Sequence, residues 1–167
     1  MKVKLLIFSL AVTVVLFSCK KTTEPDIDLG SADFTTFVTI GNSLTAGLSD
    51  GALYEEAQKN SFPSLIAKAV EIKNFEQPLM SGNGFSTDEE KGRLSFTGAT
   101  IDYLEPGNEI NRDLNRPYNN LGIPSLTVGE SYLAKVPSDA DDNHYIDKIL
   151  RNSGRTQIEE ALSLSPT

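Results

Sequence analysis

The sequence predicts an α/β fold built on a parallel sheet. Residues 34–40 are rich in β-branched and aromatic side chains and end at Gly41, which is typical of a strand that enters a turn. Residues 118–124 are predicted to form a second, shorter strand, and residues 156–164 a helix. Strands and helices in alternation are the order of a parallel α/β sheet.

The spacing of apolar residues predicts the helices between and after these strands. A helical pattern begins at Leu44, pauses near Asn60 and resumes over residues 62–70. Residues 141–151 are a further candidate helix. In the segment 62–70 four apolar side chains fall on one face: Phe62, Leu65, Ile66 and Ala69.

Residues 74–117 do not follow this alternation. They hold many Gly, Asn, Pro and Asp residues, with short apolar pieces at 94–96 and 101–104. A long irregular segment is uncommon in a compact domain and often lines a site. The last residues, Ser165 to Thr167, end a helix and turn as if a strand were to begin. Because two strands make a poor parallel sheet, we predict that the chain stops inside its domain.

The N-terminal residues have the pattern of an export signal. Lys2 and Lys4 precede an apolar run over 5–17, and the only cysteine of the chain, Cys19, follows a small residue. This junction resembles the lipobox of bacterial lipoproteins, which implies that residues 1–18 are a signal peptide and that Cys19 is lipidated. The alternative is a buried thiol within an uncleaved anchor helix. The resemblance implies a place in the bacterial cell envelope, on its periplasmic or outer-membrane face.

The segment after the cysteine is polar. Residues 19–33 are predicted to be a tether, and residues 34–167 an incomplete domain. The formal net charge of the whole chain is −8, which argues against nucleic acid as a partner because phosphate binding needs clustered Lys and Arg. Attachment to the membrane is expected through the lipid anchor.

Ser43 is the candidate nucleophile. It follows the strand that ends at Gly41, so the predicted turn projects it outward at the start of a helix, where backbone N–H groups stabilise negative charge. Gly47 would let this helix pack close to the sheet. The alternative is that Ser43 only caps the helix. The spacing differs from the Gly-x-Ser-x-Gly elbow of α/β-hydrolases.

The run from Phe37 to Gly47, Phe-Val-Thr-Ile-Gly-Asn-Ser-Leu-Thr-Ala-Gly, resembles the first block of the SGNH/GDSL hydrolases. This resemblance implies a flavodoxin-like three-layer α/β/α sandwich in which Ser43 attacks carboxylic esters. Asn42 stands where the family has Asp.

A second block, residues 119–125 (Asn-Asn-Leu-Gly-Ile-Pro-Ser), resembles the family segment whose final Gly donates a backbone N–H to the oxyanion. Aligned on Pro124, that position is Ser125. The resemblance therefore implies an oxyanion hole made by the N–H groups of Ser43 and Ser125. The alternative is an ordinary loop after a strand.

The one histidine is not assigned as the base. Asp141 and His144 reproduce the family's Asp-x-x-His spacing, but in the family that pair follows a Gly-x-Asn-Asp block that does not occur here. A polar, acidic run of this kind is more often the solvated start of a helix. We therefore expect His144 on the surface, and the base beyond Thr167.

Two functions follow from the sequence. The first is an ester hydrolase of the cell envelope with an ester as its substrate partner, of low activity as this chain alone, since nucleophile and base act as a unit. The second is a non-catalytic envelope lipoprotein that binds a glycan or a protein. No metal or organic cofactor is predicted, because there is no Cys/His cluster and no Gly-rich phosphate loop.

Overall fold

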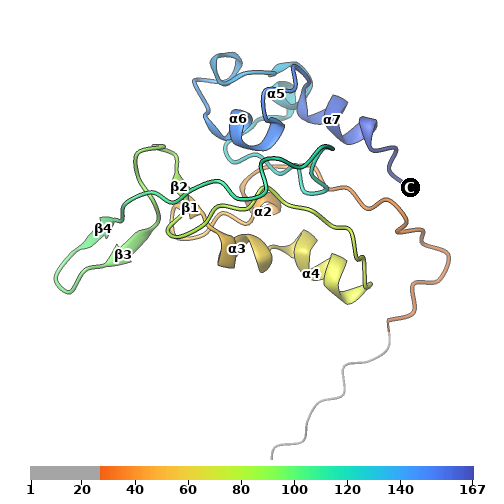
Figure 1. The fold of residues 1–167 in the computed structure, drawn as a ribbon, viewed down its shortest axis with the longest axis horizontal. Helices are drawn as coiled ribbons and strands as arrows, with labels where there is room; N and C mark the ends of the chain where they lie inside the picture. Colours follow the sequence, from red (N-terminus) through yellow and green to blue (C-terminus); the bar gives the residue numbers. More distant parts are fainter. Residues whose placement is uncertain (1–26) are drawn as a thin grey trace, which may run out of the picture.

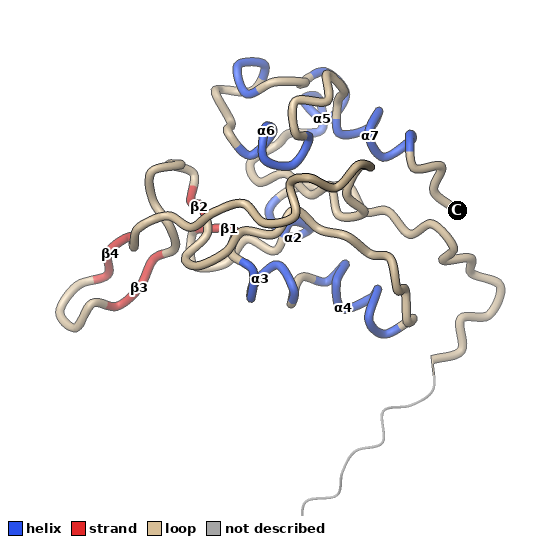
Figure 2. The backbone as a smooth tube through the Cα atoms, viewed as in Figure 1, coloured by secondary structure: helices blue, strands red, loops and turns tan. Residues whose placement is uncertain are grey.

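A computed structural model of the protein describes residues 27–167, so the predicted signal peptide 1–18 and Cys19 lie outside the described residues. Loops run between two groups of helices, α3 and α4 on one side and α5 to α7 on the other (Figure 1, Figure 2). The order is α2 (Ser43–Ala46), β1 (Ala52–Leu53), α3 (Glu55–Lys59), α4 (Phe62–Ala69), β2 (Phe85–Ser86), β3 (Leu94–Phe96), β4 (Ile101–Tyr103), α5 (Val128–Leu133), the 3-10 turn η1 (Pro137–Asp139), α6 (Tyr145–Leu150) and α7 (Gln157–Ser163).

Both sheets are small and antiparallel. β1 pairs with β2, with Leu53 opposite Phe85, and β3 pairs with β4, with Ser95 opposite Asp102. The β3–β4 hairpin projects from one end of the molecule (Figure 2). β3 and β4 use the short apolar pieces within residues 74–117, and apart from β2 the rest of that segment is loop, as its composition predicts.

Within residues 27–167, parallel pairing is limited to one place. Thr39 forms an isolated parallel bridge with Asn120. Its N–H donates to the Asn119 carbonyl at 2.8 Å, and its carbonyl accepts from the Leu121 N–H at 2.9 Å. The Ile123 N–H continues this pattern to the Gly41 carbonyl at 3.0 Å. Residues 37–41 and 119–123, here called the parallel pair, therefore lie side by side and run in the same direction.

The predicted three-layer α/β/α sandwich is wrong for the part of the chain that the structure describes. Residues 27–167 contain two antiparallel two-stranded sheets and six α-helices rather than a parallel sheet. Parallel strands are covered on both faces and need long apolar runs. The 80 residues between Thr39 and Asn120 supply none, because their strands are two or three residues long and interrupted by turns.

The core lies between the parallel pair and α6. From the pair come Leu121 and Ile123, both fully buried, with Val38 packed against them. α6 contributes an almost completely buried face: Tyr145, Ile146, Ile149 and Leu150. Burial of aliphatic and aromatic side chains contributes about 1.5–3 kcal/mol each, so this cluster carries much of the stability.

The helices predicted over 62–70 and 156–164 form as α4 and α7, and that over 141–151 is shorter, as α6. The helical pattern predicted from Leu44 to near Asn60 is interrupted, because β1 separates α2 from α3. α4 is oriented differently from its apolar pattern. Phe62 and Leu65 are each 49% exposed, whereas Ser64 and Ala67 are buried against the rest of the domain. α7 begins at a capping box, in which the Thr156 hydroxyl accepts from the Glu159 N–H and the Glu159 carboxylate accepts from the Thr156 N–H.

Candidate functional site

Ser43 lies at the turn that follows the first segment of the parallel pair. It is the first residue of α2 and is half-buried. Asn42, not Ser43, occupies the N-cap position, and its side chain makes no capping hydrogen bond. The interpretation of Ser43 as the helix cap is therefore wrong.

The turn depends on its glycines. At Gly41, φ is +150°, and a Cβ there would lie 2.2 Å from Oγ1 of Thr45. At Gly47, φ is +83°, and a Cβ would lie 2.9 Å from Cα of Gln58. A side chain at either position would force neighbouring groups to move. The two glycines thus fix how α2 leaves the parallel pair.

The buried side chain of Asn120 ties this turn to its surroundings. Its Nδ2 donates to the carbonyl of Thr45 at 2.8 Å and to Oε1 of Gln77 at 3.1 Å. Its Oδ1 accepts from the Gly122 N–H at 3.1 Å and from the Thr39 hydroxyl at 3.3 Å. Because Asn120 is 1% exposed, these bonds are shielded from water and hold α2 against the parallel pair.

Gln157 of α7 also bridges the two segments of the pair. Its Nε2 donates to the carbonyl of Gly41 and to the carbonyl of Leu121, each at 2.7 Å. The side chain is 3% exposed. The turn that carries Ser43 is therefore held by two buried amide side chains, those of Asn120 and Gln157.

Ser125 follows the second segment of the pair and is exposed, with φ of +63°. This left-handed conformation is one that glycine adopts without strain. Since the two segments run in parallel, Ser43 and Ser125 leave the pair at the same end.

Ser125 lines a cavity of about 240 Å³ together with His144, Thr87 and Asp141. Ser43 is not part of this lining. The structure thus brings the predicted oxyanion donor Ser125 together with His144 in one cavity, and leaves the predicted nucleophile outside it.

The side chain of His144 is half-buried, and its contacts join it to other parts of the fold. Its Nε2 lies 2.8 Å from the Ser86 carbonyl, which only accepts, so Nε2 carries the proton. Its ring packs on Tyr145 with centroids 4.3 Å apart. Burial lowers the pKa of His144 and the nearby Lys148 ammonium adds to this, so the imidazole is neutral at pH 7. The prediction of a surface histidine is therefore wrong.

A second hollow, of about 640 Å³, begins at the residue after Ser43. It is lined by Leu44, Leu48, Tyr54 and Phe62, with Arg93 at its side. The Arg93 guanidinium lies over the Tyr54 ring, 4.8 Å from its centroid.

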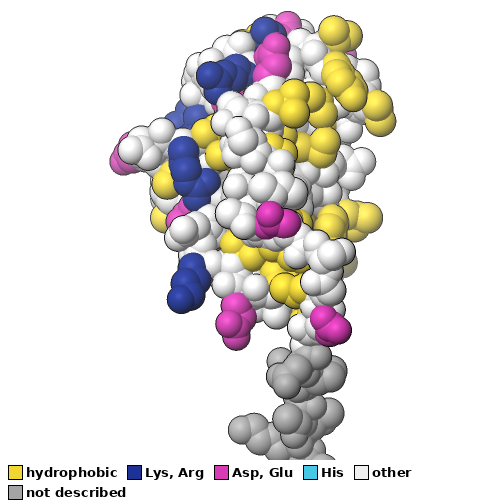
Figure 3. All heavy atoms as spheres, turned by 90° about the vertical axis from the view of Figure 1, so that its right-hand side faces the viewer, with side chains coloured by type: hydrophobic (Ala, Val, Ile, Leu, Met, Phe, Trp, Pro, Cys, Tyr) yellow, Lys and Arg dark blue, Asp and Glu magenta, His cyan; other side chains and the backbone are white. Residues whose placement is uncertain are grey.

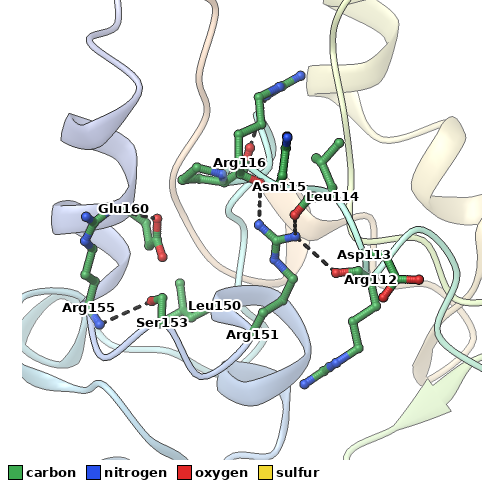
Figure 4. Close-up of a pocket in the computed structure, with 11 residues that line it drawn as sticks. Arg112, Asp113, Leu114, Asn115, Arg116, Leu150, Arg151, Ser153, Arg155 and Glu160 are labelled. Atoms are coloured by element: carbon green, nitrogen blue, oxygen red, sulfur yellow. Dashed lines mark hydrogen bonds and ion pairs between the residues drawn. The ribbon is translucent and has the colours of Figure 1, made fainter.

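A third hollow, of about 510 Å³, is rich in arginine, but its central arginine holds the fold together. The Arg151 guanidinium donates to the carbonyls of Arg112, Leu114 and Arg116 (Figure 4). Its plane also lies 4.5 Å from the centroid of the Tyr118 ring. These bonds fix residues 112–116, the loop that precedes the second segment of the parallel pair. They also occupy the N–H donors of Arg151 that an anionic ligand would need.

No protein-family model matches the chain, and no curated protein or solved structure was found to be similar to it.

Two structural findings bear on the predicted partners. Within residues 27–167, no group of His, Cys, Asp or Glu side chains is arranged to hold a metal ion. Over the same described residues, no helix combines the length and the hydropathy needed to cross a membrane.

The two residues that position the turn, Asn120 and Gln157, are not among the functional residues that the sequence predicts. Asn120 belongs to the second block, and its neighbour Asn119 is also a buried amide that accepts from the Glu76 N–H. Two adjacent asparagines before an apolar loop indicate buried amide side chains that donate to and accept from several segments of the chain. Gln157 carries no such signal, because nothing in the sequence places the first turn of α7 beside Gly41.

Proposed function

We propose that the protein is an ester hydrolase in which Ser43 is the nucleophile and the Ser125 N–H is one donor to the oxyanion. The observation that carries this proposal is the parallel pair. Its Thr39–Asn120 bridge makes the segments before Ser43 and Ser125 end at the same edge. In open α/β sheets ligands bind beyond the carboxyl ends of adjacent parallel strands, and the parallel pair reproduces this arrangement over a single bridge rather than in a sheet.

The surroundings of Ser43 support attack on a carboxylic ester. The residue is half-buried on a turn held by two glycines and two buried amides, so its position is fixed before a substrate binds. Prior positioning of this kind lowers the entropic part of a reaction barrier. The hollow beside it begins at Leu44 and is largely apolar, which suits the acyl part of an ester.

A fluorophosphonate probe tests the nucleophile. Because no base is assigned to Ser43, we expect labelling of the folded protein to be slow, but faster on the pre-positioned Ser43, mapped by mass spectrometry, than on the exposed Ser165. The adduct should be absent from Ser43→Ala and retained in Ser125→Ala, which keeps the backbone N–H. An adduct on another serine, or none on protein whose Leu121 amide stays protected from exchange, would contradict the proposal.

We also propose that the chain is exported and anchored in the bacterial cell envelope through lipid on Cys19. The support is the sequence of residues 1–19 alone. Expression in a bacterium fed with an alkynyl fatty acid should label the wild-type chain and not Cys19→Ser. Equal labelling of the two chains would refute the anchor.

One observation favours the second function, a non-catalytic lipoprotein that binds a glycan or protein. Ser125 and His144 share a cavity that does not include Ser43. In that case Thr87→Leu, which adds bulk to the cavity wall, would abolish glycan or protein capture, while Ser43→Ala would leave it intact. The probe experiment separates this function from hydrolysis.

A further inference from the structure

Arg93 differs from the other arginines of residues 27–167, because its guanidinium makes no hydrogen bond or ion pair within that range. Each of the others pairs with at least one carbonyl or carboxylate oxygen: Arg112, Arg116, Arg151 and Arg155. In Arg93, Nε is buried and has no partner among the described residues. A donor of this kind is rare in a folded protein and calls for an explanation.

The position of Arg93 is nevertheless fixed. Its N–H donates to the Asn83 carbonyl at 2.8 Å, and its carbonyl accepts from the Leu104 N–H at 3.0 Å. The guanidinium lies over the Tyr54 ring, whose hydroxyl donates to the Asp50 carboxylate at 2.6 Å. Stacking on a ring occupies the flat face of a guanidinium and leaves the N–H donors at its edge. Since Nε is buried, the donors that can reach a ligand are those of the two Nη groups.

The hollow that Arg93 lines is largely apolar. Its volume is about 640 Å³, and its walls include Leu44, Leu48 and Phe62. Leu44 is 77% exposed and Phe62 is 49% exposed. Apolar side chains left open to water beside an unpaired cation suit a ligand that has an apolar body and an anionic end. Such a ligand would also cover part of the exposed apolar face of α4.

The nearby charges favour a carboxylate, with its single negative charge, over a phosphate. Glu56 also lines the hollow, so Arg93 and Glu56 together bring one positive and one negative charge to it. The chain has a formal net charge of −8, and Figure 3 shows basic and acidic side chains on the same face of the molecule. A surface of mixed sign does not concentrate multivalent anions. One guanidinium, in contrast, binds one carboxylate through two parallel N–H bonds.

We propose that this hollow is a binding site for an apolar carboxylate. The two Nη groups of Arg93 would donate to the carboxylate oxygens, and the hydrocarbon body would lie against Leu48 and Phe62. The site does not depend on the chemistry of Ser43. Because Leu44 directly follows Ser43, the preferred ester would be one whose acyl part ends in a carboxylate, a consequence that rests on the proposed function.

Ligand titration followed by NMR tests the site. The probe is phenylpropanoate, and phenylpropanamide is the neutral ligand of the same size. We expect phenylpropanoate to shift the amide signals of Leu48 and Phe62 and to bind at least about tenfold more tightly than phenylpropanamide. Inorganic phosphate, which lacks the apolar body, should bind more weakly than phenylpropanoate.

Two substitutions of equal charge separate the site from the general field of the protein. Arg93→Gln should weaken phenylpropanoate at least about tenfold and leave phenylpropanamide within about twofold. Lys73→Gln removes the same charge at an exposed position outside the hollow and should change either affinity by less than about twofold. Protection of the Leu121 amide from exchange reports that each variant is folded. Glu56→Gln leaves the contacts of Arg93 intact and should tighten phenylpropanoate by about two- to threefold.

Equal affinities for phenylpropanoate and phenylpropanamide would overturn the proposal. So would equal losses in Arg93→Gln and Lys73→Gln, an unchanged affinity in Glu56→Gln, or a phosphate affinity that matches that of phenylpropanoate. Ser43→Ala should bind phenylpropanoate as the wild-type chain does. Failure of the carboxylate site is therefore read from the titration, and failure of the hydrolase proposal from fluorophosphonate labelling of Ser43.

Discussion

Asn120 donates a hydrogen bond of 2.8 Å from its side-chain amide to the carbonyl of Thr45, across 75 residues of sequence. Through this bond the second segment of the parallel pair holds the helix that begins at Ser43. The same amide reaches Gln77, so three distant parts of the chain meet at one buried side chain. The position of Ser43 is therefore a property of the tertiary structure rather than of its own turn.

Asn120→Asp should destabilise the fold strongly. The change keeps the size of the side chain but removes both donors and places a carboxylate against the oxygens of Thr45 and Gln77. A buried acceptor without a partner costs about 1–3 kcal/mol, and a buried charge costs more. Urea unfolding at pH 7 measures the loss. Asn115→Asp, at an exposed position, is the control and should change stability by no more than about 0.5 kcal/mol.

Gly122 allows α2 to approach the parallel pair. A Cβ there would lie 2.3 Å from the Ala46 nitrogen and 2.7 Å from the Thr45 carbonyl carbon, both backbone atoms. We expect Gly122→Ala to cost about 1–3 kcal/mol by overpacking and to slow labelling of Ser43. Gly129→Ala in α5, where nothing lies within 4 Å, should stabilise by about 0.5–1 kcal/mol. Equal effects of the two changes, measured by urea unfolding, would show that the close approach is unimportant.

The sequence predicts those features that depend on interactions between residues close together in the chain. The helix near 156–164 forms because Thr156 and Glu159 complete a capping box, and the loop character of 74–117 follows from its composition. The two strands predicted at 34–40 and 118–124 pair through only one isolated bridge, Thr39 with Asn120, and not as part of a sheet.

The sheet itself was not predictable from two strand-like segments. A parallel sheet requires further strands between these two. The spacing of apolar residues along the sequence does not show whether the intervening residues pair as strands, because that pairing depends on the tertiary structure. The cavity that joins Ser125 to His144 was missed for the same reason, since His144 reaches the Ser86 carbonyl across 58 residues. A polar run around His144 favours a surface position, but packing on Tyr145 buries half of the ring.

Ser125→Gly should stabilise the protein. With φ of +63°, Ser125 is in the left-handed region, which costs a residue with a Cβ about 1 kcal/mol. Glycine relieves most of this strain, although it adds entropy to the unfolded chain. We expect a net gain of a few tenths to about 1 kcal/mol in urea unfolding, with labelling of Ser43 unchanged. Ser163→Gly, within α7, should be destabilising by about 0.5–1 kcal/mol. A loss of stability in Ser125→Gly would mean that the serine side chain contributes a contact of its own.

The pH dependence of stability reports on His144. Burial lowers its pKa in the folded state below 6.5, so the unfolded chain binds this proton more readily. Above pH 6.5 both states are neutral and there is no effect, whereas stability should fall as the pH drops below 6.5 toward the folded pKa. The carboxylates whose pKa is lowered, such as Asp88 and Glu159, act only below about pH 4.5. The comparison of urea midpoints at pH 7.5 and 5.5 therefore isolates the histidine. His144→Gln keeps a donor for the Ser86 carbonyl and should remove most of the difference, while leaving the rate of Ser43 labelling within about twofold. A large loss of labelling in this variant would instead make His144 the base that activates Ser43.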